Sequence, residues 1–319
     1  MTQRLLTGRG SELARRAAAA GVAVRPVPWG PSLDPRALWQ LIGELLAFEP
    51  VILHAHDSHA LELAYWARRL VGHRRRAPAL VATRRVDFHV RRHSVWHRAD
   101  CVVAISDAVQ RVLRSDGVPA AAITVVRSGI DPDEVRQAAA QPLNIRARLA
   151  LPADTPVAAN VAALVDHKDQ RTLLRAAAAA RAARPDLHWV IAGEGRLRAA
   201  LEAEIAHLGL TDRCHLLGHV PEADALIREA NVLVMSSKEE GLGSVVLHAL
   251  ALGTPVVATR GGGLPELVPD PWLAPVGDAG ALARTVLEAL AHPSPVPFPP
   301  QCTAAEMARG VLAVYRSLV

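Results

Sequence analysis

The sequence predicts an α/β protein in which helices cover parallel sheets, arranged as two doubly wound units. Apolar runs of strand length alternate with helical runs along nearly the whole chain, which is typical of that architecture. The chain has 319 residues, enough for two domains, and 50% of them are hydrophobic, so sizeable cores can form. Alanine and leucine dominate and only 3% of residues are aromatic, which favours helices packed on buried parallel strands over an all-β fold.

Residues 1–140 are expected to form the first unit. Its helical segments are predicted at residues 35–48 and 60–71. Its short strands are predicted at residues 22–29, 50–56, 79–83, 101–106 and 123–129. Four prolines interrupt residues 131–156, where polarity is mixed, so this stretch is the predicted connection between the units.

A second alternating series begins at residue 157 and forms the second unit, residues 141–295. Its strands are predicted at residues 157–164, 188–193, 214–218, 231–237, 255–259 and 272–277. Its helices are predicted at residues 170–183, 196–208, 222–229, 244–252 and 279–291. A proline-rich connector and a helix at residues 304–318 follow. Ligands of such sheets bind at the carboxyl ends of the strands.

Positive charge is concentrated in one window of the first unit. Residues 51–100 contain ten arginines against four acidic residues, whereas the whole chain has a net charge of +5. Two interpretations stay open: a solvated arginine-rich surface, or a basic face for a phosphorylated or membrane-borne acceptor. Nucleic acid is a poorer match, because aromatic residues for base stacking are scarce and no DNA- or RNA-binding motif is present.

The sequence also bears on the cellular setting. No apolar run approaches the roughly 20 residues needed to cross a bilayer, and the start MTQRLLTGRG is too polar and basic for a signal peptide. The three cysteines are far apart and form no CxxC pair. We therefore expect a reduced cytoplasmic protein, peripheral at the inner face of the cell membrane if the basic window contacts lipid.

The most informative stretch is residues 240–266, EGLGSVVLHALALGTPVVATRGGGLPE. A carboxylate and two glycines precede an apolar helix that ends at Gly253, and a buried strand and three consecutive glycines follow. Glycine lets backbone approach a ligand closely, and a helix N-terminus offers unpaired N–H groups to a phosphate. The stretch therefore predicts an anion-binding turn between a strand and a helix.

This stretch resembles the donor-binding signature of the family 4 retaining glycosyltransferases of the GT-B fold, and the resemblance covers most of the chain. It implies two Rossmann-like domains that face a cleft, with residues 1–140 on the acceptor side and residues 141–295 binding a nucleotide-sugar donor. It also implies that a tail, residues 296–319, carries the last helix back to the N-terminal domain.

The family signature has two glutamates separated by seven residues, and Glu240 occupies the first position. The resemblance implies that Glu240 binds hydroxyls of the donor sugar; a carboxylate can accept two hydrogen bonds from adjacent hydroxyls and so orient a hexose. The N–H groups expected to face the β-phosphate at the helix N-terminus belong to Gly241, Leu242, Gly243 and Ser244. The alternative is a purely structural turn.

His248 stands where the family has the second glutamate, which binds ribose hydroxyls. A carboxylate would accept two hydrogen bonds there, whereas a neutral imidazole accepts only one. Three interpretations stay open. His248 still binds ribose with fewer hydrogen bonds, or it marks a shifted nucleotide preference, or donor binding has decayed.

The resemblance implies further donor-side residues. Lys168 matches a lysine that reaches the donor diphosphate, where a positive charge suits a leaving group that gains negative charge. The alternative is a solvated lysine at a helix start, and an arginine that usually precedes it is replaced by alanines at residues 162–163. Gly195 ends a Gly-Glu-Gly turn that could contact phosphate, although a tight strand-to-helix turn explains it equally well. Gly218 and Val220 resemble the segment whose backbone meets the nucleotide base.

Acceptor-side residues are expected in the N-terminal half. Many family members have a histidine after a strand, near the reacting sugar, but here residues 79–83 are followed by Arg84 and Arg85, with Asp87 close behind. The alignment favours Arg85 as the replacement. The TRRVDF run is similar to a bacterial subgroup linked to lipopolysaccharide or capsule assembly. An arginine there can hold a phosphate or carboxylate through two parallel hydrogen bonds.

Residues 54–59, HAHDSH, resemble a metal-binding cluster. They nearly match the HxHxDH motif of metallo-β-lactamase-like hydrolases, with the aspartate one place early. Such a hydrolase would need further ligands on a different topology, so no metal is expected. His56 and Asp57 are instead expected to line the cleft on the acceptor side.

Family members usually open with a strand and a glycine-rich turn, but this chain resembles the family from its second strand onward. The N-terminal domain is therefore expected to lack its first strand, and a parallel sheet without it leaves backbone groups to cover. Three explanations stay open: a start that lies upstream, a reorganised domain, or a strand supplied by a partner chain.

The sequence therefore predicts a hexosyltransferase-type enzyme that moves a sugar from a nucleotide-sugar donor to a glycan or glycolipid acceptor in lipopolysaccharide, capsule or other cell-envelope synthesis. Because Lys168 and helix N-terminal amides would stabilise the leaving diphosphate, the resemblance implies no cofactor besides this co-substrate and no bound metal. One alternative is a non-catalytic GT-B subunit that binds a partner or a glycan, motivated by His248 and the missing strand. The other is different nucleotide-sugar chemistry such as epimerisation, which would need further carboxylates.

Overall fold

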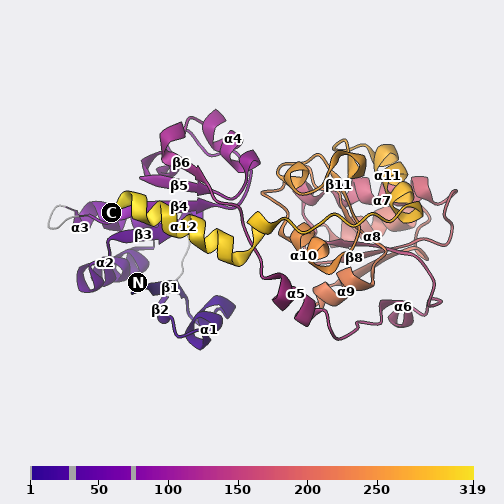
Figure 1. Cartoon of the computed structure of the whole chain (residues 1–319), viewed down its shortest axis with the longest axis horizontal. Helices are drawn as coiled ribbons and strands as arrows, with labels where there is room; N and C mark the ends of the chain where they lie inside the picture. Colours follow the sequence, from indigo (N-terminus) through magenta and orange to yellow (C-terminus); the bar gives the residue numbers. More distant parts are fainter. Residues whose placement is uncertain (1, 29–33, 73–76) are drawn as a thin grey trace.

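The computed structural model describes residues 2–28, 34–72 and 77–319, and Figure 1 shows two α/β halves side by side. The N-terminal half contains β1 Arg4–Gly8, α1 Glu12–Ala19, β2 Ala23–Val27, α2 Pro35–Phe48, β3 Ile52–Ala55, α3 Ser58–Val71, β4 Ala79–Arg84, β5 Cys101–Ala104, α4 Asp107–Ser115 and β6 Ile123–Val125. Two short helices, α5 Pro132–Ala138 and α6 Ile145–Arg148, connect it to the second half.

The C-terminal half contains β7 Val157–Val161, the 3₁₀ turn η3 Asp166–Lys168, α7 Gln170–Ala180, β8 His188–Ala192, α8 Arg198–His207, β9 Cys214–Gly218, α9 Ala223–Glu229, β10 Val232–Met235, α10 Ser244–Leu252, β11 Val256–Thr259, η4 Leu264–Glu266, β12 Leu273–Ala274 and α11 Ala279–Ala291. The last helix is α12 Ala304–Leu318. The helices predicted at residues 35–48, 244–252, 279–291 and 304–318 are confirmed at those bounds.

The C-terminal half is built on one six-stranded parallel sheet in the order β12-β11-β10-β7-β8-β9. From β7 the chain continues to β8 and β9 on one side, and from β10 it continues to β11 and β12 on the other. The strand order therefore reverses between β7 and β10, and ligands of such sheets bind outside the carboxyl ends of the strands at this point. Strand β10 is buried at every position because helices cover both faces of the sheet.

The N-terminal half has a divided sheet. Strands β3-β4-β5-β6 form one parallel sheet and β1-β2 form a separate parallel pair, so β1 and β3 are not hydrogen-bonded to each other. Side chains bridge the two: Leu6 of β1 and Leu53 of β3 pack against one core cluster that includes Leu41 of α2 and Leu63 of α3. The N-terminal half is therefore held across the division by helices and not by a strand ladder.

Helix α12 leaves the C-terminal half and lies across the N-terminal sheet (Figure 1). Its Val314 is buried against Val81 of β4 and Val103 of β5. Thr303, just before the helix, forms an isolated parallel bridge with Ile130. In the described parts of the chain, no helix is long and apolar enough to cross a membrane.

Candidate functional site

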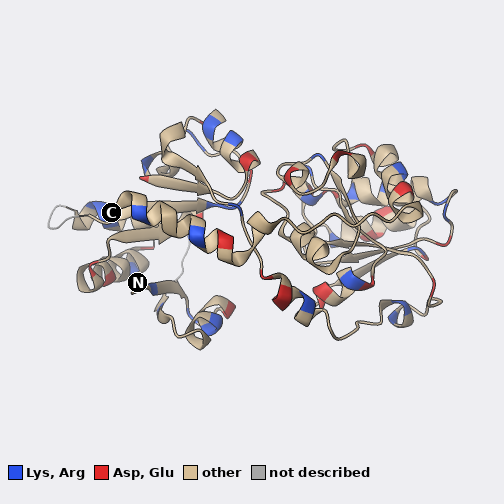
Figure 2. Ribbon diagram, in the orientation of Figure 1, with Lys and Arg blue, Asp and Glu red and all other residues tan. Residues whose placement is uncertain are grey.

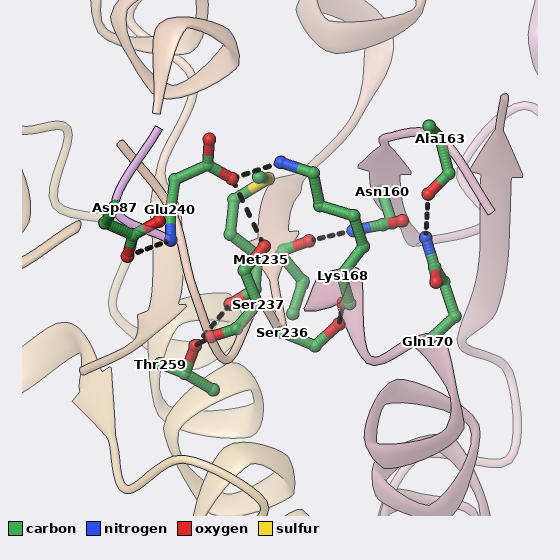
Figure 3. Close-up of polar contacts among 11 residues, drawn as sticks. Asp87, Asn160, Ala163, Lys168, Gln170, Met235, Ser236, Ser237, Glu240 and Thr259 are labelled. Atoms are coloured by element: carbon green, nitrogen blue, oxygen red, sulfur yellow. Dashed lines mark hydrogen bonds and ion pairs between the residues drawn. The ribbon is translucent and has the colours of Figure 1, made fainter. Parts of the chain in front are cut away.

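Two predicted site residues meet at the point where the strand order reverses. Lys168 follows β7 and Glu240 follows β10, and these strands are neighbours in the sheet. The Lys168 ammonium donates directly to the Glu240 carboxylate, and only 17% and 14% of the two side chains are exposed (Figure 3). Residues 72 positions apart thus form a sheltered ion pair at the expected ligand-binding edge.

Serine and threonine hydroxyls hold both loops in place. The Ser236 hydroxyl donates to the Lys168 carbonyl at 2.9 Å, and the Ser237 hydroxyl donates to the Glu240 carboxylate at 3.3 Å. The Thr259 hydroxyl, at the end of β11, donates to the Ser237 carbonyl at 2.5 Å (Figure 3). The position of the ion pair is therefore set by three adjacent strands of the sheet.

The glycines before α10 are required by the backbone. Gly243 caps the helix with φ +94°, and a Cβ on Gly241 would lie 2.2 Å from the Arg85 carbonyl oxygen. Leu242 is buried, whereas Ser244 is exposed at the first helical position. No side chain caps the N-terminus of α10, so its first N–H groups remain open to an anion.

The other predicted glycines also lie in crowded places. A Cβ on Gly195 would stand 2.3 Å from the Leu164 carbonyl oxygen, and one on Gly218, which has φ +75°, would stand 2.6 Å from Glu194 Oε1. Packing of the loops after β7, β8 and β9 therefore explains both glycines without a ligand. Val220 is half-buried against the hydrophobic cluster beneath α9.

His248, on the second turn of α10, contacts an acid that the sequence analysis did not single out. Its Nδ1 lies 2.6 Å from Oδ1 of Asp224, in the first turn of α9. Both side chains remain partly exposed, at 31% and 19%.

The donor-side loop is hydrogen-bonded to the N-terminal half. The Asp87 carboxylate, predicted on the acceptor side, accepts the Glu240 backbone N–H at 2.8 Å and is nearly buried (Figure 3). The Ser106 hydroxyl donates to the Gly241 carbonyl at 2.5 Å. Glu266 of η4 accepts two backbone N–H groups from the first turn of α4, at 2.8 and 3.1 Å. The loop after β10 is therefore positioned by both halves.

The two predicted arginines behave differently. Arg84 is buried, donates to the Phe88 carbonyl at 2.8 Å and lies over the Trp96 ring, and burial lowers its pKa. Arg85 is exposed where the two halves meet. Of these two, Arg85 is the one whose guanidinium faces solvent and a ligand.

The predicted histidine cluster is tied into the fold at one end. His54 at the end of β3 has its Nδ1 2.6 Å from the Tyr315 hydroxyl of α12 and its Nε2 2.7 Å from the Thr83 hydroxyl. Burial, with His56 and Arg85 nearby, lowers the pKa of His54 to about 3.

The exposed end of this cluster comprises His56 and Asp57. The His56 ring stacks on the His54 ring at 4.2 Å, and desolvation and the Arg85 charge lower the pKa of His56. Asp57 caps α3 by accepting the Ala60 N–H at 2.7 Å. Within the residues that the structure describes, no group of three His, Cys, Asp or Glu side chains is arranged to hold a metal ion.

The basic window does not form one uninterrupted positive surface in the described residues. Arg68 is paired with Asp100 at 2.6 Å and Arg84 is buried, while residues 74–76 lie outside the described residues. Figure 2 shows basic and acidic segments alternating through both halves.

Family models match both halves of the chain. The model described as "Glycosyl transferases group 1" matches residues 143–303, about half of the chain, and "Glycosyltransferase Family 4" matches residues 4–134. The chain belongs to the group 1 glycosyltransferases.

Relatives of this glycosyltransferase act on varied glycans. It is 34% identical to 2-deoxystreptamine glucosyltransferase of Streptomyces kanamyceticus over 206 residues, which cover 62% of this chain and 53% of the relative. It is 33% identical to the lipopolysaccharide core biosynthesis glycosyltransferase LpsE of Rhizobium meliloti over 152 residues, 47% of this chain and 44% of the relative. The matched region thus spans about half the length of these curated relatives.

A solved structure shows the fold of this glycosyltransferase. HepE of Anabaena, crystallised in complex with UDP, superimposes with a TM-score of 0.80 at 18% identity, covering 99% of this chain and 100% of that chain. The predicted GT-B fold, with its parallel sheets, is confirmed.

Several polar residues of this region were not predicted from the sequence: Ser106, Asp224, Glu266 and Tyr315. Each acts through a contact with a distant part of the chain, and no spacing pattern announces such contacts. Asp224 carried the best available indication, since it follows the predicted base-contacting segment by four residues.

Proposed function

We propose that this glycosyltransferase moves a hexose from a nucleotide-sugar donor to an acceptor hydroxyl with retention of anomeric configuration. The observation that carries the proposal is the sheltered pair of Lys168 and Glu240, which meets beside the uncapped N-terminus of α10. A carboxylate, an ammonium and a helix N-terminus are the groups that a sugar diphosphate needs. HepE, which has the same fold, has also been crystallised with UDP-glucose.

Donor binding would exchange the partners of this pair. Hydroxyls of the sugar donate to the Glu240 carboxylate, and the diphosphate takes the Lys168 ammonium and the N–H groups at the start of α10. Because both side chains are already ionised and held by neighbouring hydroxyls, little reorganisation is needed when the negative charge develops.

The reaction at the anomeric carbon then follows a front-face course. The bond from the anomeric carbon to the phosphate oxygen breaks, and the acceptor oxygen forms its bond on the same face. The acceptor proton passes to the leaving phosphate oxygen, so no protein base is required. Lys168 stabilises the phosphate as it gains charge.

The acceptor would approach from the N-terminal half, where Arg85 and the neutral His56 are exposed. A guanidinium at this place suits an acceptor that carries a phosphate or carboxylate. The relative LpsE acts in lipopolysaccharide core synthesis. A glycan or glycolipid acceptor of the cell envelope is therefore our proposal for this chain.

Isothermal titration with UDP-, GDP- and ADP-sugars tests the proposal. We expect one of the three to bind with a dissociation constant in the micromolar range, as is common for enzyme substrates. Failure of all three to bind a folded protein would contradict donor use. The divided N-terminal sheet would then favour a non-catalytic subunit that binds a partner or a glycan.

A further inference from the structure

We propose that Asp224 and His248 act together as the ribose-binding pair of the donor site. This inference rests on the proposed function, because it requires a nucleotide in the adjoining site. It assigns a binding role to Asp224 and accounts for a histidine where related enzymes have a single glutamate.

The contact between the two side chains determines what each can offer a ligand. An ionised carboxylate has no proton to donate, so the 2.6 Å contact requires a proton on His248 Nδ1. In the neutral ring, Nε2 then presents a lone pair. Within the described residues, neither this Nε2 nor the second carboxylate oxygen of Asp224 has a hydrogen-bond partner. The pair thus presents two open acceptors from partly exposed side chains.

The pair lies where the middle of a nucleotide would be. His248 is four residues beyond Ser244, which places it about 6 Å along the helix axis from the phosphate-facing end of α10. Asp224 is four residues beyond Val220, at the end of the segment expected to meet the base. In a nucleoside diphosphate, ribose is the unit that joins the base to the phosphates. Its position along this path therefore matches that of the pair.

The chemistry of ribose matches two acceptors. Its 2′ and 3′ hydroxyls are adjacent donors, and a lone neutral imidazole can accept from only one of them. The Asp224 oxygen supplies the second acceptor, and its hydrogen bond to Nδ1 fixes the ring orientation and keeps Nε2 as an acceptor. Together, an aspartate and a histidine from two helices restore the two hydrogen bonds that one glutamate would accept.

A purely structural ion pair between α9 and α10 is the competing explanation. That role would be independent of ligand hydroxyls. The test is therefore a comparison, in each variant, of the nucleoside diphosphate that binds best with its 2′,3′-dideoxy analogue. The variants are Asp224→Ala, His248→Ala and, as a matched control, Glu222→Ala, which removes an exposed acid just before the same helix.

We expect the wild-type protein and Glu222→Ala to prefer the ribonucleotide over the dideoxy analogue by at least tenfold, as about two hydrogen bonds would give. Asp224→Ala and His248→Ala should each weaken ribonucleotide binding by about tenfold and leave dideoxy binding unchanged. Adding His248→Glu to Asp224→Ala should restore the preference, because one carboxylate again offers two acceptors. Asp224→Asn serves the same comparison if the alanine variant does not fold.

Equal weakening of both nucleotides by Asp224→Ala would overturn the inference while leaving donor use intact. A wild-type protein that binds the two nucleotides equally would also overturn it. If no nucleoside diphosphate binds the wild-type protein, the proposed function fails and this inference fails with it.

Discussion

In the C-terminal half, the candidate binding groups extend from one continuous sheet, whereas in the N-terminal half they lie beside a divided one. Lys168 and Glu240 are sheltered, paired and held by neighbouring hydroxyls before any ligand arrives. Arg85 and His56 are exposed, and their neighbours Arg84 and Asp57 are used within the fold. The donor site thus depends on backbone geometry that demands particular residues, while the acceptor side depends on exposed side chains that tolerate change.

The largest effect should come from separating the charges of the donor pair. Glu240→Gln keeps the shape of the side chain but removes the charge and one acceptor, so release of nucleoside diphosphate from the donor should fall by about 100-fold or more. It also leaves the Lys168 ammonium sheltered without its partner, and loss of one member of a buried pair costs about 3 kcal/mol of stability. Rates and urea unfolding should be measured on the same preparations.

The double variant Glu240→Gln with Lys168→Met separates the two effects. It should regain most of the stability, because no unpaired charge remains, but none of the turnover. Glu239→Gln, which alters the exposed neighbouring acid, is the control and should behave like wild type. Wild-type turnover in Glu240→Gln would show that the donor sugar is bound elsewhere.

Two glycines with similar backbone conformations sharpen the claim about geometry. Gly262 has φ +54°, and a Cβ there would lie 2.1 Å from the Glu240 carbonyl oxygen and 2.3 Å from Asp87 Oδ2. Gly253 has φ +72° with open space around it. Gly253→Ala should cost about 1 kcal/mol from the left-handed backbone alone, and Gly262→Ala about 3 kcal/mol, because packing strain is added.

Donor affinity gives the second measurement for this pair. Gly262→Ala should weaken donor binding as the loop carrying Glu240 shifts, whereas Gly253→Ala should leave it unchanged. Similar stability losses in the two variants, with donor affinity intact, would mean that the contact between Asp87 and this loop does not position the site.

The same division explains how far the sequence could be interpreted. Apolar periodicity located α2, α10, α11 and α12 to the residue, because burial of one helix face is a local pattern. The glycines around Glu240 pointed to the donor loop because crowded backbone excludes other residues. Contacts between distant residues left no such pattern. The hydrogen bond from Tyr315 to His54 joins positions 261 residues apart, and nothing near either one announces the other.

A pH-dependent effect is expected in the N-terminal half. His54 is neutral in the folded protein because its pKa lies near 3, while in the unfolded chain it takes up a proton below about 6.5. Its contribution to stability is therefore complete above pH 6.5 and is lost as the pH falls toward 3, by at most about 1.4 kcal/mol per pH unit. Glutamine at this position cannot titrate.

Urea unfolding at several pH values between 7.5 and 4 measures this effect. His54→Gln should be less stable than wild type at pH 7.5, because the contacts to Tyr315 and Thr83 are altered, but its stability should fall less steeply with pH. His207→Gln, at an exposed site on α8, is the control. Parallel pH profiles for His54→Gln and wild type would show that His54 does not titrate between the folded and unfolded states as expected.

The smallest effect concerns the outer surface of the N-terminal half. Among the described residues, most exposed large hydrophobic side chains lie in this half, with Trp39 at 72% and Trp66 at 39% on the packed helices α2 and α3. Leu46 and Leu70 are exposed on the same two helices. Tryptophan favours the boundary between lipid and water, so this surface suits the membrane contact that a glycolipid acceptor would require.

Co-sedimentation with vesicles, with and without anionic lipid, measures this contact. Trp39→Ser should lower binding to anionic vesicles by about fivefold, because part of a large aromatic surface no longer enters the interface. Leu13→Ser is the control, since it removes an exposed apolar side chain from α1, which lies apart from α2 and α3 in Figure 1. Equal losses in the two variants, or no binding by the wild-type protein, would restrict the N-terminal half to acceptors that reach the enzyme in solution. A loss in Trp39→Ser alone would show that exposed side chains of this half carry a function that its backbone does not record.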